Sequence, residues 1–344
     1  MIAIVHHLFS PIRYGYVTAK AGAIKSFLLK KAFFIDAIAL KSVEGIYEML
    51  KETAYKDYLN EDIVKKFGYS NGIEHIMWKR FFSIATKMEK NLKKEDKKMF
   101  SIFMAKYEIR NMKVIVGKAL KKESFENELI TKNQIELVEK IKKIENPIKA
   151  FYSTNFWNNL KENINGNELK KLKELEREMN IEKFFIALDF AYFNALKKLK
   201  GFKTYEYEML QIDIYNIIKL LMAMKSENSE EKVREFLNDP YFIEGKITKN
   251  ALLNAFKNNK IESLLSLYSL QKDDDITILE WKAKMTLFKR IKNYYIKAGF
   301  SLDKIMLLML MLEREIILLR KIIIGKSFHE SKDLLLKEIE WLYK

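Results

Sequence analysis

The sequence YEIRNMKVIV at residues 107–116 places several polar side chains inside an apolar helical stretch. Glu108 is followed by Asn111 three positions later and by Lys113 two positions after that. The apolar neighbours and the absence of Gly and Pro within these ten residues predict a continuous helix. Related patterns recur further along the chain, so this helix is the unit from which the fold is best predicted.

A second occurrence of the acid–amide–base pattern is DIYNIIKLL at residues 213–221. Asp213 and Asn216 stand in the same relation as the first acid and amide, whereas the base, Lys219, comes one position later. The acid of this second helix follows Glu108 by 105 residues. The spacing is that of a whole supersecondary unit rather than of one helix.

A third occurrence is EIILLRKI at residues 315–322. It keeps the acid, Glu315, and the base, Arg320, but has Leu318 where the amide stood. Its acid follows Asp213 by 102 residues. Such an even period predicts one helical unit that is used three times.

Two interpretations of these polar groups remain open. An acid and an amide at i and i+3 share one helix face, whereas a base at i+5 lies about 140° further round. The groups either tie each helix pair to its neighbour by hydrogen bonds, or they face a shared cavity that holds a partner protein. On the second interpretation the partner-binding candidates are Glu108, Asn111, Lys113, Asp213, Asn216, Glu315 and Arg320.

The composition favours an all-α protein with a large core. Gly (11) and Pro (3) are scarce among 344 residues, while 49% of the residues are apolar and 13% are aromatic. Few helix breakers and abundant apolar residues predict helices and argue against disorder. No stretch reaches the ~18 uninterrupted apolar residues of a membrane span, and the first residues lack the basic segment of a signal peptide.

The helical segments fall into three predicted units, residues 1–132, 133–235 and 236–344. Each unit is expected to pair two long helices and to add shorter ones. The expected pairs are 73–88 with 100–120, 182–200 with 205–225, and 276–298 with 301–326. The last of these helices is apolar on nearly every face, which predicts burial all round. We expect Gly201, Gly299 and Gly325 to end helices.

Known chemical motifs are missing or incomplete. Gly325-Lys326-Ser327 looks like the end of a phosphate-binding loop, but Arg320 occupies the position of that motif's first Gly. The chain has no Cys, and its four His lack the i, i+4 spacing of a helical zinc site. The acidic run at residues 273–275 precedes a predicted helix and is interpreted as its N-cap. We therefore expect no catalytic residue, no metal, no cofactor and no enzymatic activity.

Two N-terminal stretches carry a resemblance to a known family. They are YxYxxAKxxAIKSxLL at residues 14–29 and SVExIxxxLxxTxY at residues 42–55. Together with the later acid–amide–base helices, they resemble the C-type subunit of the archaeal-type (A/V-type) rotary ATPases, a family similar to the d subunit of vacuolar ATPases. The resemblance covers essentially the whole chain. Lys20 stands where that family often has Arg and is a further partner-binding candidate, and Leu318 and the displaced Lys219 also depart from the repeated pattern.

By this resemblance, three similar units surround a pseudo-threefold axis in a funnel-shaped body with a central opening. The resemblance implies a non-catalytic central-rotor subunit, one copy in a hetero-oligomeric complex, peripheral to the membrane on its cytoplasmic face. Its implied partners are the central-stalk subunits and the membrane rotor ring of proteolipid subunits, with no nucleic acid. Its implied role is to transmit torque for ATP-coupled proton or sodium transport.

A different class of function stays open as an alternative. The net charge of +16 bears on partners, which include nucleic acid, anionic lipid surfaces and acidic proteins. A helical-repeat nucleic-acid-binding protein would use this charge together with the interleaved aromatic residues. Such a protein is expected to bind in a way that weakens steeply with salt.

Overall fold

The computed structural model describes residues 2–125, 130–268, 270–271 and 275–343. The structure is 77% helical, and none of these residues forms a strand, which confirms the prediction of an all-α fold. None of the helices in these ranges is long and apolar enough to span a membrane. Of the predicted acidic N-cap at residues 273–275, Asp273 and Asp274 lie outside the described ranges.

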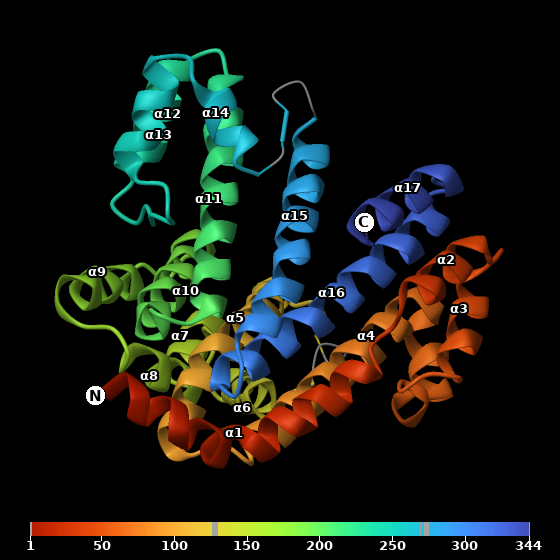
Figure 1. Cartoon of the computed structure of the whole chain (residues 1–344). Coiled ribbons are helices and arrows are strands. Elements are labelled where there is room, and N and C mark those ends of the chain that lie inside the picture. Colours follow the sequence, from red (N-terminus) through yellow and green to blue (C-terminus); the bar gives the residue numbers. More distant parts are fainter. Residues whose placement is uncertain (1, 126–129, 269, 272–274, 344) are drawn as a thin grey trace. The chain divides into compact units, whose positions relative to one another are not determined.

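The chain, shown in Figure 1, divides into two compact units. Unit 1 combines Met1–Leu92 with Trp281–Lys344, and unit 2 is the continuous segment Lys93–Glu280. The predicted threefold axis, central opening and three sequence units remain predictions.

Unit 1 is built around a central helix, α16, whose residues 305–312 are all buried. The prediction of burial all round is confirmed for this part of the helix, whereas Arg320 and Ile324 in its last turns are exposed. α16 packs against α1, α2 and α4, while α17 packs against α2. The helices of unit 1 are α1 (Ile2–Ser26), α2 (Lys31–Ala39), α3 (Val43–Leu50), the 3-10 helix η1 (Lys56–Tyr58), α4 (Glu61–Glu89), most of α15 (Ile276–Lys297), α16 (Leu302–Ser327) and α17 (Lys332–Tyr343).

In unit 1, the structure differs from the sequence prediction at the start of α4 and at Gly325 near the end of α16. α4 begins at Glu61, well before the predicted start at residue 73, and is kinked at Gly68, where φ is +74°. Gly325 does not end α16 as predicted, because the helix continues to Ser327. A Cβ on Gly325 would lie 3.1 Å from the side chain of Leu335, so this glycine lets α17 approach closely. Gly299 ends α15 with φ at +58°, as predicted.

Unit 2 contains most of the short helices. Its long helices end where the sequence predicts, within a few residues, and Gly201 follows α10 and η3 with φ at +104°. The helices are α5 (Lys94–Leu120), α6 (Lys132–Ile141), α7 (Pro147–Tyr152), α8 (Asn155–Lys161), α9 (Gly166–Arg177), α10 (Ile181–Leu196), η3 (Lys197–Leu199), α11 (Lys203–Met224), α12 (Ser229–Asn238), α13 (Lys249–Lys257) and α14 (Ile261–Ser266).

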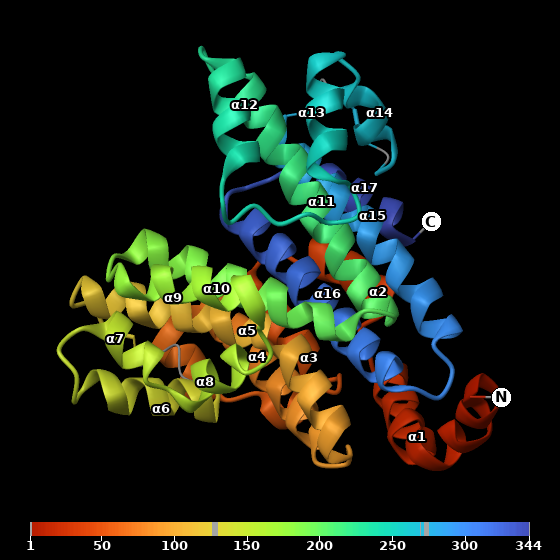
Figure 2. The ribbon, with the colours of Figure 1, turned by 90° about the vertical axis from the view of Figure 1, so that its left-hand side faces the viewer.

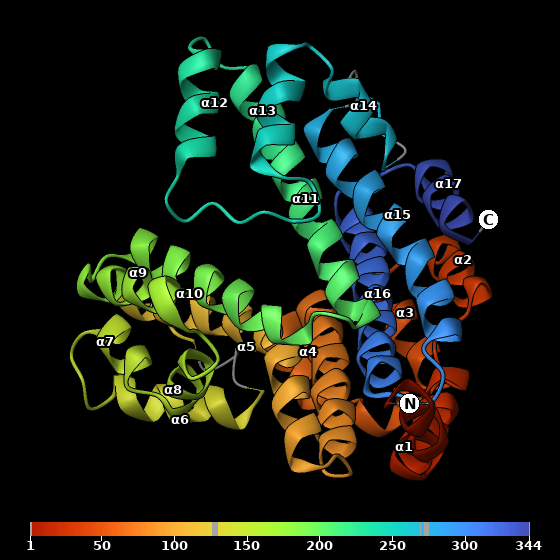
Figure 3. The ribbon, with the colours of Figure 1, turned by 60° about the vertical axis from the view of Figure 1, so that its left-hand side comes forward.

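Within each unit, the long helices pack between sequence repeats. In unit 2, α5 from the first repeat packs against α10 from the second, and Figure 2 and Figure 3 show the two side by side. In unit 1, α16 from the third repeat packs against α4 from the first. The expected pairing of 182–200 with 205–225 is therefore wrong as a packing prediction, because α10 packs mainly against α9 and α5, and α11 packs mainly against α12.

Candidate functional site

The three acids of the repeated pattern are all buried, with Glu108 8% exposed, Asp213 0% and Glu315 1%. A buried carboxylate is unfavourable unless hydrogen-bond donors surround it. Each of the three accepts hydrogen bonds from a different segment of the chain, and each therefore fixes the path of that segment beside a long helix.

Glu108 on α5 holds the start of α6. Its carboxylate accepts hydrogen bonds from Thr131 Oγ1 at 2.8 Å, Asn133 Nδ2 at 3.2 Å and Gln134 Nε2 at 3.2 Å. Burial raises the pKa of Glu108, and these three hydrogen bonds act in the opposite direction. Thr131 and Gln134 also form a capping box at the start of α6. The Glu108 carboxylate therefore binds a helix end whose conformation is already stabilised by local hydrogen bonds.

Asp213 on α11 holds the loop that leads into α13. It accepts hydrogen bonds from the Ile247 backbone N–H at 2.8 Å and from the Tyr268 hydroxyl at 2.9 Å. Burial raises the pKa of Asp213, whereas the hydrogen bonds lower it. The amide of the same pattern, Asn216, donates to the Ile243 carbonyl at 2.9 Å. Acid and amide on one helix face therefore bind one loop at two points.

The close approach of this loop depends on Gly245. A Cβ at this position would collide with the Asp213 carboxylate and would lie 2.5 Å from the Met209 carbonyl oxygen. A side chain therefore has no room between the loop and α11. Sequence reasoning did not single out this glycine, because the need for it arises only from the tertiary contact.

Glu315 on α16 joins the most distant segments. Its carboxylate accepts hydrogen bonds from the Leu29 backbone N–H and from the Tyr55 hydroxyl at 3.0 Å, and it pairs with Arg80 Nη1 at 3.4 Å. The Arg80 guanidinium also lies 4.3 Å from the centre of the Tyr55 ring. Burial raises the pKa of Glu315 to about 6, while the Arg80 cation lowers it. Burial likewise raises the pKa of Tyr55, so its hydroxyl remains a donor.

Two bases of the pattern bridge to the long helix of a neighbouring repeat. Lys113 Nζ on α5 lies 2.6 Å from Asp189 Oδ1 on α10. Arg320 Nη1 on α16 lies 3.4 Å from Glu74 Oε1 on α4. Both bridges are partly exposed, so each contributes at most about 1 kcal/mol. The first lies within unit 2 and the second within unit 1.

The remaining candidates differ in their surroundings. Lys20 on α1 is half-buried, with its Nζ 5.9 Å from the centre of the Tyr16 ring. Asn111 on α5 is also half-buried. Leu318, which replaces the amide in the third repeat, is 1% exposed and belongs to the core of unit 1. Partner binding by the eight candidate residues remains a prediction.

The exposed faces of the same helices carry apolar side chains that the sequence analysis did not select. Counted from the acid of its own helix, an exposed apolar side chain stands at position +6 on α5, at +2 and +9 on α11, and at +9 on α16, in each case on the helix face opposite the acid. We call this set the exposed stripe: Val114 (39% exposed), Tyr215 (57%), Met222 (47%) and Ile324 (41%). On α11 the exposed Lys219 lies between two of them, with its Nζ 5.6 Å from the centre of the Tyr215 ring. The helical register from each acid was the signal that would have found them.

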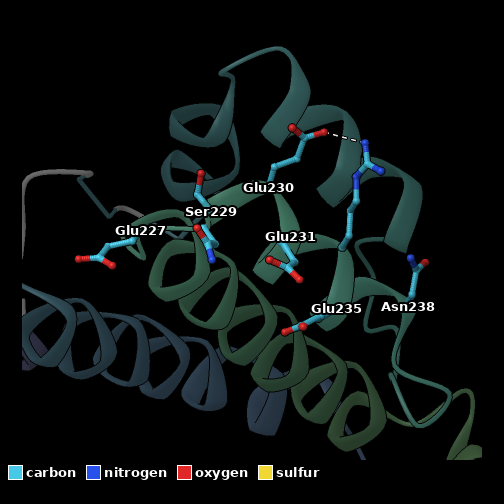
Figure 4. A pocket seen from close by; sticks show the side chains of 8 residues that line it. Glu227, Ser229, Glu230, Glu231, Glu235 and Asn238 are labelled. Atoms are coloured by element: carbon cyan, nitrogen blue, oxygen red, sulfur yellow. Dashed lines mark hydrogen bonds and ion pairs between the residues drawn. The ribbon is translucent and has the colours of Figure 1, made fainter.

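An open hollow at the start of α12 and along it is lined by acidic and other polar side chains (Figure 4). Glu230 is paired with Arg234 at 2.6 Å, and both side chains are mostly exposed. The other carboxylates in the hollow are Glu227, Glu231 and Glu235. In the part of the chain that the structure describes, no group of three His, Cys, Asp or Glu residues is placed to hold a metal ion.

Residues 17–337 match the family model described as ATP synthase (C/AC39) subunit. The match covers nearly the whole chain and confirms the resemblance seen at residues 14–29 and 42–55. No individual curated protein matches the chain. All of unit 2 falls within the matched range, as does unit 1 apart from residues at the two ends of the chain.

Proposed function

The chain belongs to the ATP synthase (C/AC39) subunit family of A/V-type rotary ATPases, and on that basis we propose that it is a non-catalytic rotor subunit. In this role it joins the central stalk to the membrane rotor ring. It transmits torque between the part of the complex that handles ATP and the ring that carries protons or sodium ions. It acts as one copy in the hetero-oligomeric complex, peripheral to the cytoplasmic face of the cell membrane.

The observation that carries the proposal is the part of the exposed stripe that lies on α11 of unit 2. Tyr215 and Met222 stand seven residues apart on α11, with Lys219 between them on the same face. Large exposed apolar side chains beside a cation are typical of the anchors of protein interfaces. A helical stalk with an apolar and acidic surface is the partner that this combination fits.

Torque transmission also requires that the binding helices resist displacement. The buried carboxylates support this requirement, because each fixes a loop or helix end against the opposite face of a stripe helix. Asp213 and Asn216 bind the loop before α13 on the buried face of α11, while Tyr215 projects from its exposed face. A load applied to the exposed side chain is therefore passed to a close-packed interior rather than to a free helix.

The proposal is tested by binding of the purified chain to the purified pair of stalk subunits. Replacing Tyr215 and Met222 together by Ser should weaken this binding at least tenfold, because the loss of two interface anchors exceeds about 1.4 kcal/mol. The matched control replaces Leu267 (57% exposed) and Ile135 (50%), which lie away from the stripe register, and should leave binding unchanged. Equal effects of the two double variants, or no binding by the unchanged chain, would refute the assigned surface.

The coupling role has its own test in the assembled complex. Complexes reconstituted without the chain should hydrolyse ATP without transporting ions, and adding the chain back should restore transport. Full coupling in its absence would show that the chain is not the rotor connection.

A further inference from the structure

The excess of positive over negative charge is concentrated in two segments of unit 1, because these segments lack acidic residues. Residues 1–35 and 281–302 together contain 11 Lys or Arg residues and not a single Asp or Glu. Nine of the eleven are Lys. These short segments account for most of the net charge of +16, so the charge is not spread evenly over the chain.

The fold brings the two segments together at one corner of unit 1. Lys25, at the end of α1, places its Nζ 4.6 Å from the centre of the Tyr295 ring on α15. The Nζ of Lys304, at the start of α16, lies 5.0 Å from the centre of the same ring. In Figure 1, Figure 2 and Figure 3 the turn between α15 and α16 lies beside α1. The end of α1 and the end of α15 therefore lie next to each other.

The same two helix ends also expose large apolar side chains. Phe27 is 64% exposed, Ile296 63% and Phe300 51%. Lys292, Ile296 and Phe300 follow one another at intervals of four residues along the exposed side of α15 and the turn after it. We call the set the α1/α15 patch: Lys25, Phe27, Lys292, Ile296, Lys297 and Phe300.

We propose that the α1/α15 patch docks directly on the anionic surface of a lipid bilayer. Lysine ammonium groups are attracted to anionic headgroups, while neighbouring aromatic and aliphatic side chains enter the boundary between headgroups and acyl chains. The lysines can extend their apolar stems along the same boundary. The partner is therefore the lipid itself, in addition to the stalk and the ring that the rotor role requires.

The chemistry of the patch favours lipid over nucleic acid. Nucleic-acid surfaces rely on Arg forks for phosphate and base edges and on flat rings for base stacking. Here nearly all cations are Lys, and Ile296, one of the most exposed side chains of the patch, offers no stacking surface. An aliphatic side chain beside lysines instead gains from burial in the interfacial region of a bilayer.

The test is co-sedimentation of the full chain with vesicles of phosphatidylglycerol and phosphatidylcholine (1:1) and with vesicles of phosphatidylcholine alone. The chain should partition at least tenfold more strongly onto the anionic vesicles, and the difference should shrink at high salt. Replacing Lys292 and Lys297 by Gln should weaken anionic binding about 25-fold, since each lysine contributes about fivefold. A second variant replaces Ile296 and Phe300 by Ser. It should weaken binding of the chain to the anionic vesicles even at high salt, because the apolar contribution to binding is not screened by salt.

Matched controls come from exposed side chains of unit 2. Replacing Lys257 and Lys260 by Gln removes the same charge, and replacing Ile135 by Ser removes a side chain of similar exposure. Neither should change partitioning more than twofold. Equal binding to both vesicle types, no binding, or equal losses in patch and control variants would overturn the proposal. Binding of short duplex RNA or DNA that is lost with the same patch variants, without vesicle binding, would replace lipid by nucleic acid.

The vesicle experiment contains no stalk or ring subunit. Its outcome is therefore independent of the stalk-binding assay, and either proposal can fail while the other holds.

Discussion

Replacing Glu315 by Gln should change how the stability of unit 1 depends on pH. Glu315 accepts hydrogen bonds from the Leu29 N–H and the Tyr55 hydroxyl, and it pairs with Arg80. Gln keeps the size of the side chain and one accepting oxygen, but it has no proton to release. The substitution therefore separates the effect of ionisation from the effect of filling the site.

Burial raises the pKa of Glu315 from its usual 4.5 to about 6, so the folded protein holds this proton more tightly than the unfolded chain does. The stability contributed by the carboxyl group is fully present below pH 4.5 and is lost as the pH rises through about 6. A shift of about 1.5 units corresponds to about 2 kcal/mol. The free energy of unfolding of the unchanged protein, minus that of the variant, should therefore fall by about 2 kcal/mol between pH 4.5 and 7.5.

The measurement is urea unfolding at constant ionic strength across this pH range, followed by circular dichroism. Taking the difference between proteins cancels the titration of all other carboxylates. Glu139→Gln, on the exposed side of α6, is the matched control, and its difference curve should remain within about 0.5 kcal/mol. If the difference in the free energy of unfolding for Glu315→Gln stays constant or rises with pH, the reasoning is refuted. Burial would then not raise the pKa of Glu315 by more than the Arg80 guanidinium lowers it.

Three further substitutions probe the contacts of unit 2 by thermal unfolding. Gly245→Ala should destabilise by about 3 kcal/mol, because its methyl group collides with the carboxylate beneath the loop, whereas Gly15→Ala meets no atom within 4 Å and should cost less than about 0.5 kcal/mol. Equal effects would contradict the close approach. Lys106→Met removes the cation 2.6 Å from buried Glu208 and should lower the free energy of unfolding by about 3 kcal/mol. Adding Glu208→Gln should restore most of this stability, because no unpaired charge is then left buried. If the double variant is no more stable than Lys106→Met, loss of the ion pair is not the cause. Asp189→Asn should cost less than about 1 kcal/mol, because this carboxylate is 54% exposed, and a loss above about 2 kcal/mol would contradict a surface bridge.

The helices themselves were largely predictable because their signals are local. Scarce glycine and proline, apolar periodicity and the even spacing of Glu108, Asp213 and Glu315 are all properties of neighbouring residues. The errors occurred where tertiary packing decided. A glycine at position 325 predicts a helix end, but its missing side chain instead lets α17 approach α16 closely. Gly68 allows a kink inside a helix that is longer than predicted.

The candidate site was predictable in its polar residues but not in their partners. Donors such as the backbone N–H groups of Leu29 and Ile247 exist at every residue, so no sequence signal selects them. Arg80 likewise carries no pattern that links it to an acid more than two hundred residues later. The exposed stripe could have been predicted, because its residues lie on the helix face opposite each acid and that face follows from the helical repeat.

The two units differ in when their chain segments become available during synthesis. Unit 2 is one continuous segment and can complete its core as soon as it has left the ribosome. In unit 1, Arg80 precedes its partner Glu315 by 235 residues, which at roughly 5–20 residues per second is a delay of about 12–50 s. During that interval α1 to α4 lack the helix that fills their core. The nascent segment Met1–Leu92 therefore presents an apolar surface suited to chaperone binding until α16 emerges and completes the unit.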